Sequence, residues 1–324
     1  MSALRRTSGA ALAACLLIAA GAGAQSYPSQ RIRVVVGYGA GGGADSLIRA
    51  VAPELAEALG QQIVVDNRPG GSTVIGTQIV ATSRPDGYTF LVAESAYMVN
   101  PFLFAKLPYD SQRDFTPVVA IASSSSTLLV VHPSVQVKTV RELVALARTR
   151  PGELSYASGG NGTIPHLLAE MLKHEAKLKL PHIPYKSTAA AIYAATSGEV
   201  PTAFGGIFAL RGLLESGRLR ALAIASAART PLLPAVPTFV EAGWPSIEAT
   251  SYRGLLAPAG TPREAVMRLN ADTNKVLQIP AVRARLAESA LAPVGGTPEE
   301  FGRLIRGEMD KWGKIIRAAG IKAE

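Results

Sequence analysis

The sequence predicts an α/β protein built from two similar units, and three observations lead to this prediction. The chain has 324 residues, which at roughly 150 residues per domain suggests two domains. Hydrophobic residues make up 48% of the chain and charged residues only 18%, so a disordered protein is excluded and a large core can form. Short apolar strands, glycine-rich loops and amphipathic helices then alternate, as is typical of a parallel sheet covered by helices.

The N-terminal segment predicts export from the cell. Arg5 and Arg6 precede an apolar stretch, Gly9–Ala24, that is too short to span a bilayer comfortably and ends in an A-x-A cleavage signal. We therefore interpret residues 1–24 as a secretory signal peptide. A lipoprotein cleavage box that ends at Cys15 also fits this segment, and it would leave the protein anchored to a membrane by a lipid.

Composition narrows the possible ligands. One cysteine cannot form an internal disulfide, and four histidines without cysteine partners argue against a structural zinc site. The net charge of +9 is spread along the chain, and aromatic residues make up only 6%. Because basic and aromatic residues do not alternate in any segment, nucleic acid is not an expected partner. A mildly positive field favours small anions instead.

The first unit is expected to contain three strands and two helices. Runs of β-branched residues mark the strands, apolar residues at helical spacing mark the helices, and Gly60 ends the first helix. In chain order, the expected elements are a strand at 31–36, a glycine-rich turn at 37–43, a helix at 47–59, a strand at 62–66, a glycine loop at 69–72, a helix at 73–82 and a strand at 88–92.

The second unit repeats this rhythm. A capping box opens its first helix, and Trp312 belongs to the apolar stripe of the last helix of the chain, where it is expected to pack in the core. The expected elements are a strand at 127–131, a helix at 139–148, a strand at 154–157, a glycine loop at 158–163, helices at 164–177 and 187–196, strands at 200–204 and 219–225, an extended stretch at 250–257, and helices capped near Thr261 and Thr297.

The first glycine-rich turn has two interpretations. Gly37, Gly39 and Gly42 follow a strand and precede a helix, with Asp66 near the end of the next strand, and this pattern fits a dinucleotide-binding fingerprint. An exported NAD-binding oxidoreductase is therefore one possibility. The same layout recurs at residues 158–163, however, and a single dinucleotide site does not require a second copy.

Two glycine loops that face each other across a cleft would instead hold a carboxylate. Glycine lets the backbone approach a ligand closely, and a helix N-terminus carries free N–H groups and about half a positive charge. Asp45 opens the first helix, either as its N-cap or as a ligand contact. His166 follows the second loop and is expected to pack, whereas Lys186 and Arg253 are the charged residues nearest the predicted cleft.

No motif for a catalytic nucleophile, a phosphate-binding loop or a metal-binding histidine pair occurs in the sequence. We therefore predict no catalytic residues, no metal ligands and no cofactor. The expected ligand is a small organic carboxylate.

A series of motifs, in their order and spacing, resembles the Bug-type periplasmic solute-binding receptors of the tripartite tricarboxylate transporter system. The resemblance covers essentially the whole exported chain. The motifs that carry it are Tyr27–Arg33, Tyr38 to Asp45, Asp66–Gly70, Pro85–Thr89, Asn100-Pro101, Tyr109-Asp110 with Asp114-Phe115, Tyr156–Thr163 with His166-Leu167, His182–Lys186, Pro237-Thr238 with Glu241–Gly243, and Leu256–Pro262.

The resemblance implies a type II periplasmic-binding-protein fold, in which two α/β domains are joined by two crossover strands and enclose a ligand cleft. Residues 25–126 and 253–324 are expected to form domain 1, and residues 127–252 domain 2. The ligand-binding residues expected from the resemblance and from the loop pattern are Tyr38, Ala40, Gly41, Asp45, Ser95, Ser158, Gly160, Asn161 and Thr163.

The resemblance also implies a function. We expect a non-catalytic receptor in the periplasm that captures a small organic carboxylate between its lobes and delivers it to the membrane subunits of a tripartite tricarboxylate transporter. A monomer suffices for this role, and a sensory module that signals ligand occupancy has the same sequence features. The chain departs from the family pattern at Ser187 and at Gly205-Gly206, where the family commonly has a glycine and an acidic residue respectively.

Overall fold

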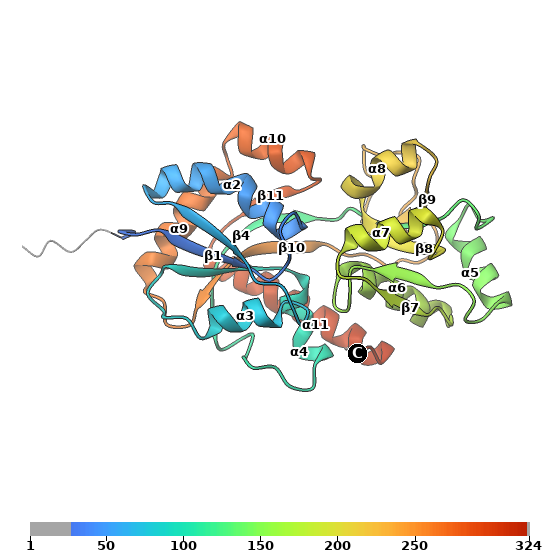
Figure 1. Cartoon of the computed structure of the whole chain (residues 1–324), viewed down its shortest axis with the longest axis horizontal. Helices are drawn as coiled ribbons and strands as arrows, with labels where there is room; N and C mark the ends of the chain where they lie inside the picture. Colours follow the sequence, from blue (N-terminus) through green and yellow to red (C-terminus); the bar gives the residue numbers. More distant parts are fainter. Residues whose placement is uncertain (1–26, 323–324) are drawn as a thin grey trace, which may run out of the picture.

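The computed structural model describes residues 27–322 of the chain. These residues form two lobes, each built around one sheet with helices packed on it (Figure 1). We call the lobe with the six-stranded sheet the first lobe and the lobe with the five-stranded sheet the second lobe. The predicted signal peptide and Cys15 lie outside the described residues. Within the described part of the chain, no helix is both long and apolar enough to cross a membrane.

The first lobe combines the two ends of the described chain. Its sheet has the strand order β11-β4-β10-β3-β1-β2. Its elements are β1 (Ile32–Val36), α2 (Gly43–Leu59), β2 (Ile63–Asn67), α3 (Val74–Ala81), β3 (Thr89–Ala93), α4 (Ser95–Leu103), β4 (Phe115–Ser124), β10 (Ser251–Pro258), α9 (Arg263–Val276), α10 (Pro280–Glu288), β11 (Ala292–Gly295) and α11 (Pro298–Ala319).

The second lobe is made from the middle of the chain. Its sheet has the strand order β7-β6-β8-β5-β9. Its elements are β5 (Thr127–Val131), α5 (Val140–Thr149), β6 (Tyr156–Ser158), α6 (Ile164–Ala176), β7 (His182–Pro184), α7 (Thr188–Ser197), β8 (Thr202–Gly206), α8 (Ile207–Glu215) and β9 (Arg220–Ile224).

Both sheets are mixed, whereas the sequence pattern alone favoured parallel sheets. In the first lobe β1 pairs in parallel with β2 and β3, but β10 is antiparallel to both β3 and β4. In the second lobe β6 is parallel to β7 and β8, but β5 is antiparallel to β8 and β9. The antiparallel strands arise because β4 carries the chain into the second lobe and β10 carries it back.

Local sequence signals explain several element ends. Gly60 adopts a left-handed conformation (φ 66°) and ends α2, as glycine does at many helix C-termini. Thr297 caps α11 in a full capping box with Glu300, and Thr139 caps α5. The predicted cap at Thr261 is wrong, because the N-cap residue of α9 is Pro262 and the Thr261 hydroxyl instead donates to the Pro258 carbonyl.

Packing joins the lobes along one side. Val99 and Leu103 of α4, together with Trp312 and Ile316 of α11, belong to the same buried cluster as Leu167 of α6 in the second lobe. Trp312 is only 1% exposed, so its predicted role in the core is confirmed. The predicted domain boundaries stay a prediction, because two helices of the first lobe share core with the second.

Candidate functional site

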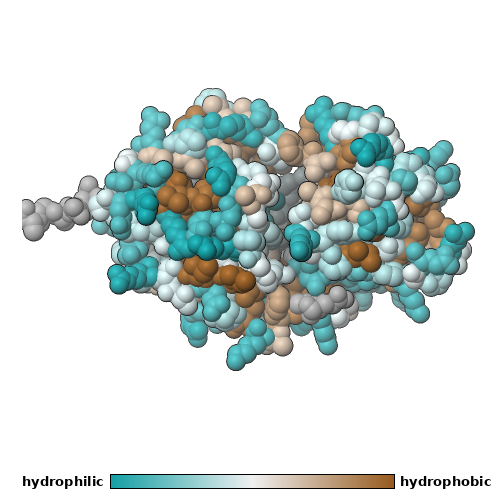
Figure 2. All heavy atoms as spheres, in the orientation of Figure 1, coloured by the Kyte–Doolittle hydropathy of each residue, from teal (hydrophilic) through white to brown (hydrophobic). Residues whose placement is uncertain are grey.

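The carboxyl ends of the parallel strands place six helix N-termini at two sheet edges. In the first lobe α2 follows β1, α3 follows β2 and α4 follows β3, and in the second lobe α6, α7 and α8 follow β6, β7 and β8. In open α/β sheets, ligands bind at this edge. The N-terminal end of α2 points toward the second lobe (Figure 1), and a furrow marks the surface where the lobes meet (Figure 2).

A direct contact brings the two edges together. Ser72, in the loop between β2 and α3, has a hydroxyl that donates to the Asn161 carbonyl of the second glycine loop at 3.3 Å. Asn100 of α4 holds Ser72 in place, because its side-chain amide donates to the Ser72 carbonyl at 2.8 Å. A Cβ atom on Gly162 would lie 2.9 Å from a methyl group of Leu103. The second glycine loop therefore packs directly on the first lobe.

The contacting loop of the first lobe is strained. Ser72 and Thr73 have positive φ angles of 50° and 75°, and such a backbone is unfavourable for a β-branched residue like threonine. Strain of this kind gathers at ligand clamps and switch regions. Its position at the contact between the lobes marks this loop as part of the candidate site.

In the first glycine loop, two of the predicted residues stabilise the loop itself. The Gly41 N–H donates to the Asp45 carboxylate at 2.8 Å, and the Arg49 guanidinium donates to the same carboxylate at 3.0 Å. Asp45 is 3% exposed. The expected N-cap role of Asp45 is wrong, because Gly42 is the N-cap residue of α2, and Asp45 lies three residues further on.

The Asp45 carboxylate remains ionised. Burial by itself would raise the pKa of Asp45, but the hydrogen bonds from Arg49 and from the Gly41 backbone outweigh burial and hold the pKa below its usual range. Arg49 thereby offsets the negative charge at the start of α2. An anionic ligand at this helix end consequently meets a neutralised carboxylate.

The backbone N–H groups of Ala40, Gly43 and Ala44 remain available at the start of α2. Among residues 27–322 none of the three has a hydrogen-bond acceptor, as expected for the first turn of a helix without a side-chain cap. Ala40 and Gly43 are exposed. These groups can therefore donate to a carboxylate.

Tyr38 stands beside an ion pair at the same helix end. Arg253 of β10 donates from Nε to the carboxylate of Glu94, the N-cap residue of α4. Burial raises the pKa of Tyr38 above its ordinary value; the nearby Glu94 carboxylate adds to this rise, and Arg253 opposes it. Tyr38 therefore presents a protonated hydroxyl. Ser95 follows Glu94 as the first residue of α4 and is 8% exposed.

In the second glycine loop, Ser158, Gly160 and Thr163 hold the loop in shape. The Ser158 hydroxyl lies 2.7 Å from Nε2 of His182 and accepts from the Gly160 N–H at 3.2 Å. The Thr163 hydroxyl donates to the Gly160 carbonyl at 2.8 Å. Ser158 is fully buried, so its hydroxyl acts within the loop.

Asn161 is the residue of this loop whose polar groups remain free. Within the described part of the chain, neither its backbone N–H nor its side-chain amide has a hydrogen-bond partner, and only its carbonyl is used, by Ser72. The residue is half-buried. It is therefore the strongest candidate donor that the second lobe offers across the contact.

His166 packs against the second glycine loop and holds it in place. Its ring stacks on His182 with centroids 4.5 Å apart, and its Nδ1 accepts from the Gly162 N–H at 3.2 Å. Burial first, then His182 and Lys173, lower the pKa of His166 to about 3. The side chain is 4% exposed, so the expectation that His166 packs is confirmed.

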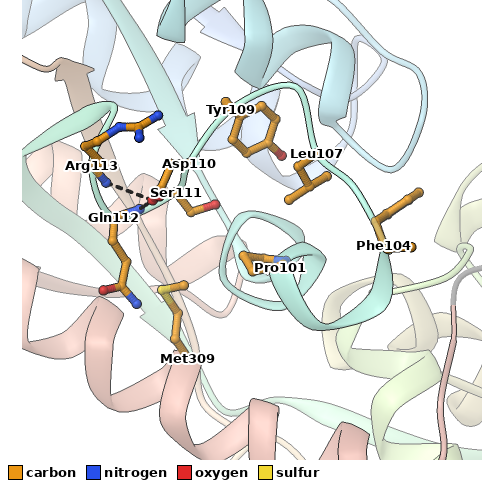
Figure 3. Close-up of a pocket in the computed structure, with 10 residues that line it drawn as sticks. Pro101, Phe104, Leu107, Tyr109, Asp110, Ser111, Gln112, Arg113 and Met309 are labelled. Carbon is orange, nitrogen blue, oxygen red and sulfur yellow. Dashed lines mark hydrogen bonds between the residues drawn. The ribbon is translucent and has the colours of Figure 1, made fainter.

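Two hollows in the surface lie elsewhere. One, of about 510 Å³, lies between α4, the following loop and α11, with Pro101, Tyr109 and Met309 in its walls (Figure 3). The other, of about 530 Å³, lies between β11 and α11. Neither includes a predicted ligand-binding residue. Within residues 27–322, no group of three or more His, Cys, Asp or Glu side chains could hold a metal ion.

The dinucleotide interpretation does not fit the contacts. Asp66, which would hold a ribose, accepts from Nη2 of Arg33 at 2.6 Å and from Nε of Arg68 at 2.9 Å. Both arginines therefore occupy its carboxylate. Gly37 is packed so closely on Thr73 that an added Cβ would lie 2.7 Å from it. The first glycine has a packing role.

Sequence reasoning missed Ser72 and Glu94 as site residues. In the sequence, Ser72 lies in a glycine loop that indicates only the start of a helix, and Asn100 lies in a motif that indicates only the family resemblance. Glu94 follows a strand without any flanking pattern, and its partner Arg253 lies 159 positions away. Only the folded chain brings these residues to one place.

Known proteins resemble this chain over most of its length. The profile of the tripartite tricarboxylate transporter family receptor matches residues 47–321. A protein encoded in the tcbD-tcbE intergenic region of Pseudomonas sp. is 36% identical over 292 residues, covering 90% of this chain and 87% of that protein. Protein BugT of Bordetella pertussis is 34% identical over 307 residues, covering 94% of each.

Solved structures show the same arrangement. The R. palustris protein Rpa4515, solved with adipate, is 35% identical, has a TM-score of 0.85, and matches 92% of this chain and 100% of its own. MatC from Rhodopseudomonas palustris, solved with bound malate, is 29% identical with a TM-score of 0.83, over 90% of this chain and 100% of its own. The predicted fold is confirmed, and the oxidoreductase alternative is set aside. The chain belongs to the tripartite tricarboxylate transporter receptor family.

Proposed function

We propose that this protein is an exported receptor that binds one small organic carboxylate between its lobes and delivers it to the membrane subunits of a tripartite tricarboxylate-type transporter. It works in the periplasm as a monomer, after residues 1–24 have been removed. One observation carries the proposal: the β2–α3 loop of the first lobe contacts the second glycine loop through Ser72 and Asn161. Unpaired N–H groups lie at Asn161 in the second lobe and, next to the β2–α3 loop, at Ala40 and Gly43 at the start of α2.

Backbone and amide donors of this kind suit a carboxylate. Each charge-assisted hydrogen bond contributes roughly 1.5–3 kcal/mol, so several together offset the cost of removing a carboxylate from water. Tyr38 adds a protonated hydroxyl, and Ser95 lies at the start of the neighbouring helix α4. Gly41, Asp45, Ser158, Gly160 and Thr163 shape the loops.

Binding drives closure only when the ligand has a higher affinity for the closed state than for the open state. Donors from both lobes provide this difference, because an open molecule contacts the ligand from one side only. The closed surface is then the signal that the membrane subunits recognise. Adipate and malate, which are bound to the two relatives, are the first acids to test.

Calorimetry with adipate and malate tests the proposal. Wild-type protein is expected to bind at least one of the two acids. Asn161→Asp keeps the size of the side chain but puts a negative charge against the ligand carboxylate, so the affinity should fall at least tenfold, equivalent to about 1.4 kcal/mol.

Gln62→Glu is the matched control. It adds the same charge on an exposed residue next to the C-terminal end of α2, about 25 Å from the helix start at 1.5 Å per residue, and should leave affinity within twofold. Equal affinity of the wild type and the Asn161→Asp variant would contradict the proposed site. Mass spectrometry of the exported protein separates cleavage after residue 24 from a lipid anchor at Cys15.

A further inference from the structure

Arg253 lies beside the start of α2, on the strand β10 that returns to the first lobe. The register between β10 and β4 shifts between Arg253 and Gly254, and such bulges re-aim side chains next to binding sites. Gly254 permits the close approach, because a side chain there would collide with the Val119 carbonyl and the ring of Phe301. The bulge thus fixes where the Arg253 side chain leaves the strand.

The guanidinium reaches the start of α2. Its Nη2 would lie 3.5 Å from a Cβ atom placed on Gly43, and Glu94 Oε1 would lie 4.0 Å from the same point. Gly43 is one of the residues with a free N–H in the proposed carboxylate site. Arg253 therefore stands beside the position at which the proposed ligand binds.

The donors of Arg253 are only partly used. Nε is paired with Glu94, and the two side chains are 17% and 11% exposed. Nη1 is shielded from solvent and has no hydrogen-bond acceptor among residues 27–322. A guanidinium carries five N–H donors in a rigid fork, and a buried charged donor without an acceptor is costly. The protein therefore supplies fewer acceptors than this group needs.

Glu94 balances the charge of Arg253. The pair is neutral as a whole, so it attracts an anion only through the short distance between the guanidinium donors and an acceptor oxygen. A ligand with one carboxylate satisfies the helix start and gains little from Arg253. A ligand with a second carboxylate provides the acceptor that the fork lacks, and fork-shaped donors match carboxylates well.

We infer that Arg253 is a specificity-determining residue that accepts the second carboxylate of a dicarboxylate ligand, and that Glu94 limits the affinity by opposing this charge. The inference rests on the proposed carboxylate-binding function. It predicts selectivity between acids that differ only in the second carboxylate. Adipate and hexanoate are such a pair, since both have six carbons and hexanoate lacks one acid group.

Calorimetry with adipate and hexanoate tests the inference on four proteins. Wild type should bind adipate more tightly than hexanoate. Arg253→Gln should weaken adipate binding at least tenfold and hexanoate binding less than twofold, and Arg253→Lys should lie between. Glu94→Gln breaks the ion pair but keeps the guanidinium, so adipate binding should tighten at least threefold.

Arg285→Gln is the control for a general loss of positive charge. Arg285 pairs with Glu54 on α2 at 2.5 Å, outside the site, and its loss should change neither affinity by more than twofold. A purely structural Arg253–Glu94 pair would instead make Arg253→Gln and Glu94→Gln weaken both acids equally.

The outcomes separate the two proposals. Equal affinity of wild type for adipate and hexanoate, unchanged selectivity in both Arg253 variants, or the structural pattern just described would overturn this inference while leaving carboxylate binding intact. Failure of the wild type to bind adipate, malate and hexanoate would overturn the proposed function as well.

Discussion

At the scale of single residues, the glycine loops contain two kinds of polar group. Some are already used by the loop: the Gly41 N–H by Asp45, and the Gly160 N–H by Ser158. Others have no partner in the described chain, and Asn161 is the clearest of them. Sequence motifs identify the loop but do not separate these two roles, because a hydrogen bond between residues two or four apart depends on how the turn is folded.

His166 gives a pH dependence with a defined direction. Its pKa of about 3 lies below the ordinary value of about 6.5, so the unfolded chain takes up the proton first. The stabilisation is therefore complete above pH 6.5 and is lost as the pH falls from 6.5 toward 3, by up to about 1.4 kcal/mol per pH unit.

His166→Phe should flatten this dependence between pH 6.5 and 5, measured by denaturant unfolding. The variant should also lower stability at pH 7.5 by about 1–3 kcal/mol, since the Gly162 N–H loses its acceptor. His174→Gln, on the exposed end of α6, serves as control and should keep the wild-type slope. An unchanged slope in His166→Phe would refute the role of this ring.

At the scale of elements, the capping box of α11 makes a separate prediction. Thr297 accepts from the Glu300 N–H, and the Glu300 carboxylate accepts from the Thr297 N–H. Thr297→Ala should cost about 1 kcal/mol of unfolding free energy. Thr297→Ser keeps the hydroxyl and should restore most of it, whereas equal loss in both variants would point to side-chain packing in place of capping.

The sequence predicted elements well where the signal was local. Gly60 ended α2 as expected, and the strand at 127–131 was found with its exact bounds. The sequence-based prediction of helices and strands failed where local signals conflict with the fold. Pro101 lies inside α4, and Pro117 lies inside β4, so neither element was recognised. Strand order could not be derived, because β10 joins its sheet from more than 120 residues beyond β4.

At the scale of the whole molecule, the site depends on two lobes, and the chain passes from the first lobe to the second and back again. Ser125 and Thr250 lie on the two crossing segments, and their hydroxyls are 2.7 Å apart. The family resemblance predicted this architecture, which the comparison with known structures confirms. The pairing of Arg253 with Glu94 was beyond prediction, since it needs both the crossover and a bulge.

Ligand binding should therefore change the stability and the shape of the molecule together. Adipate at one hundred times its dissociation constant should stabilise the folded state by about 2.7 kcal/mol, measured by thermal unfolding. Small-angle scattering should record a smaller radius of gyration with adipate than without it. Binding with an unaltered scattering profile would show that capture occurs without closure.

The buried cluster shared by α4, α11 and α6 determines the direction from which a solute arrives. Apolar side chains of both lobes pack together along that side. Separating the lobes there would expose the buried cluster to water. We therefore expect the two lobes to separate on the side away from this cluster, where the start of α2 points toward the second lobe (Figure 1). An acid ligand is thus expected to enter past the first turn of α2 and to meet the free amides of that turn first.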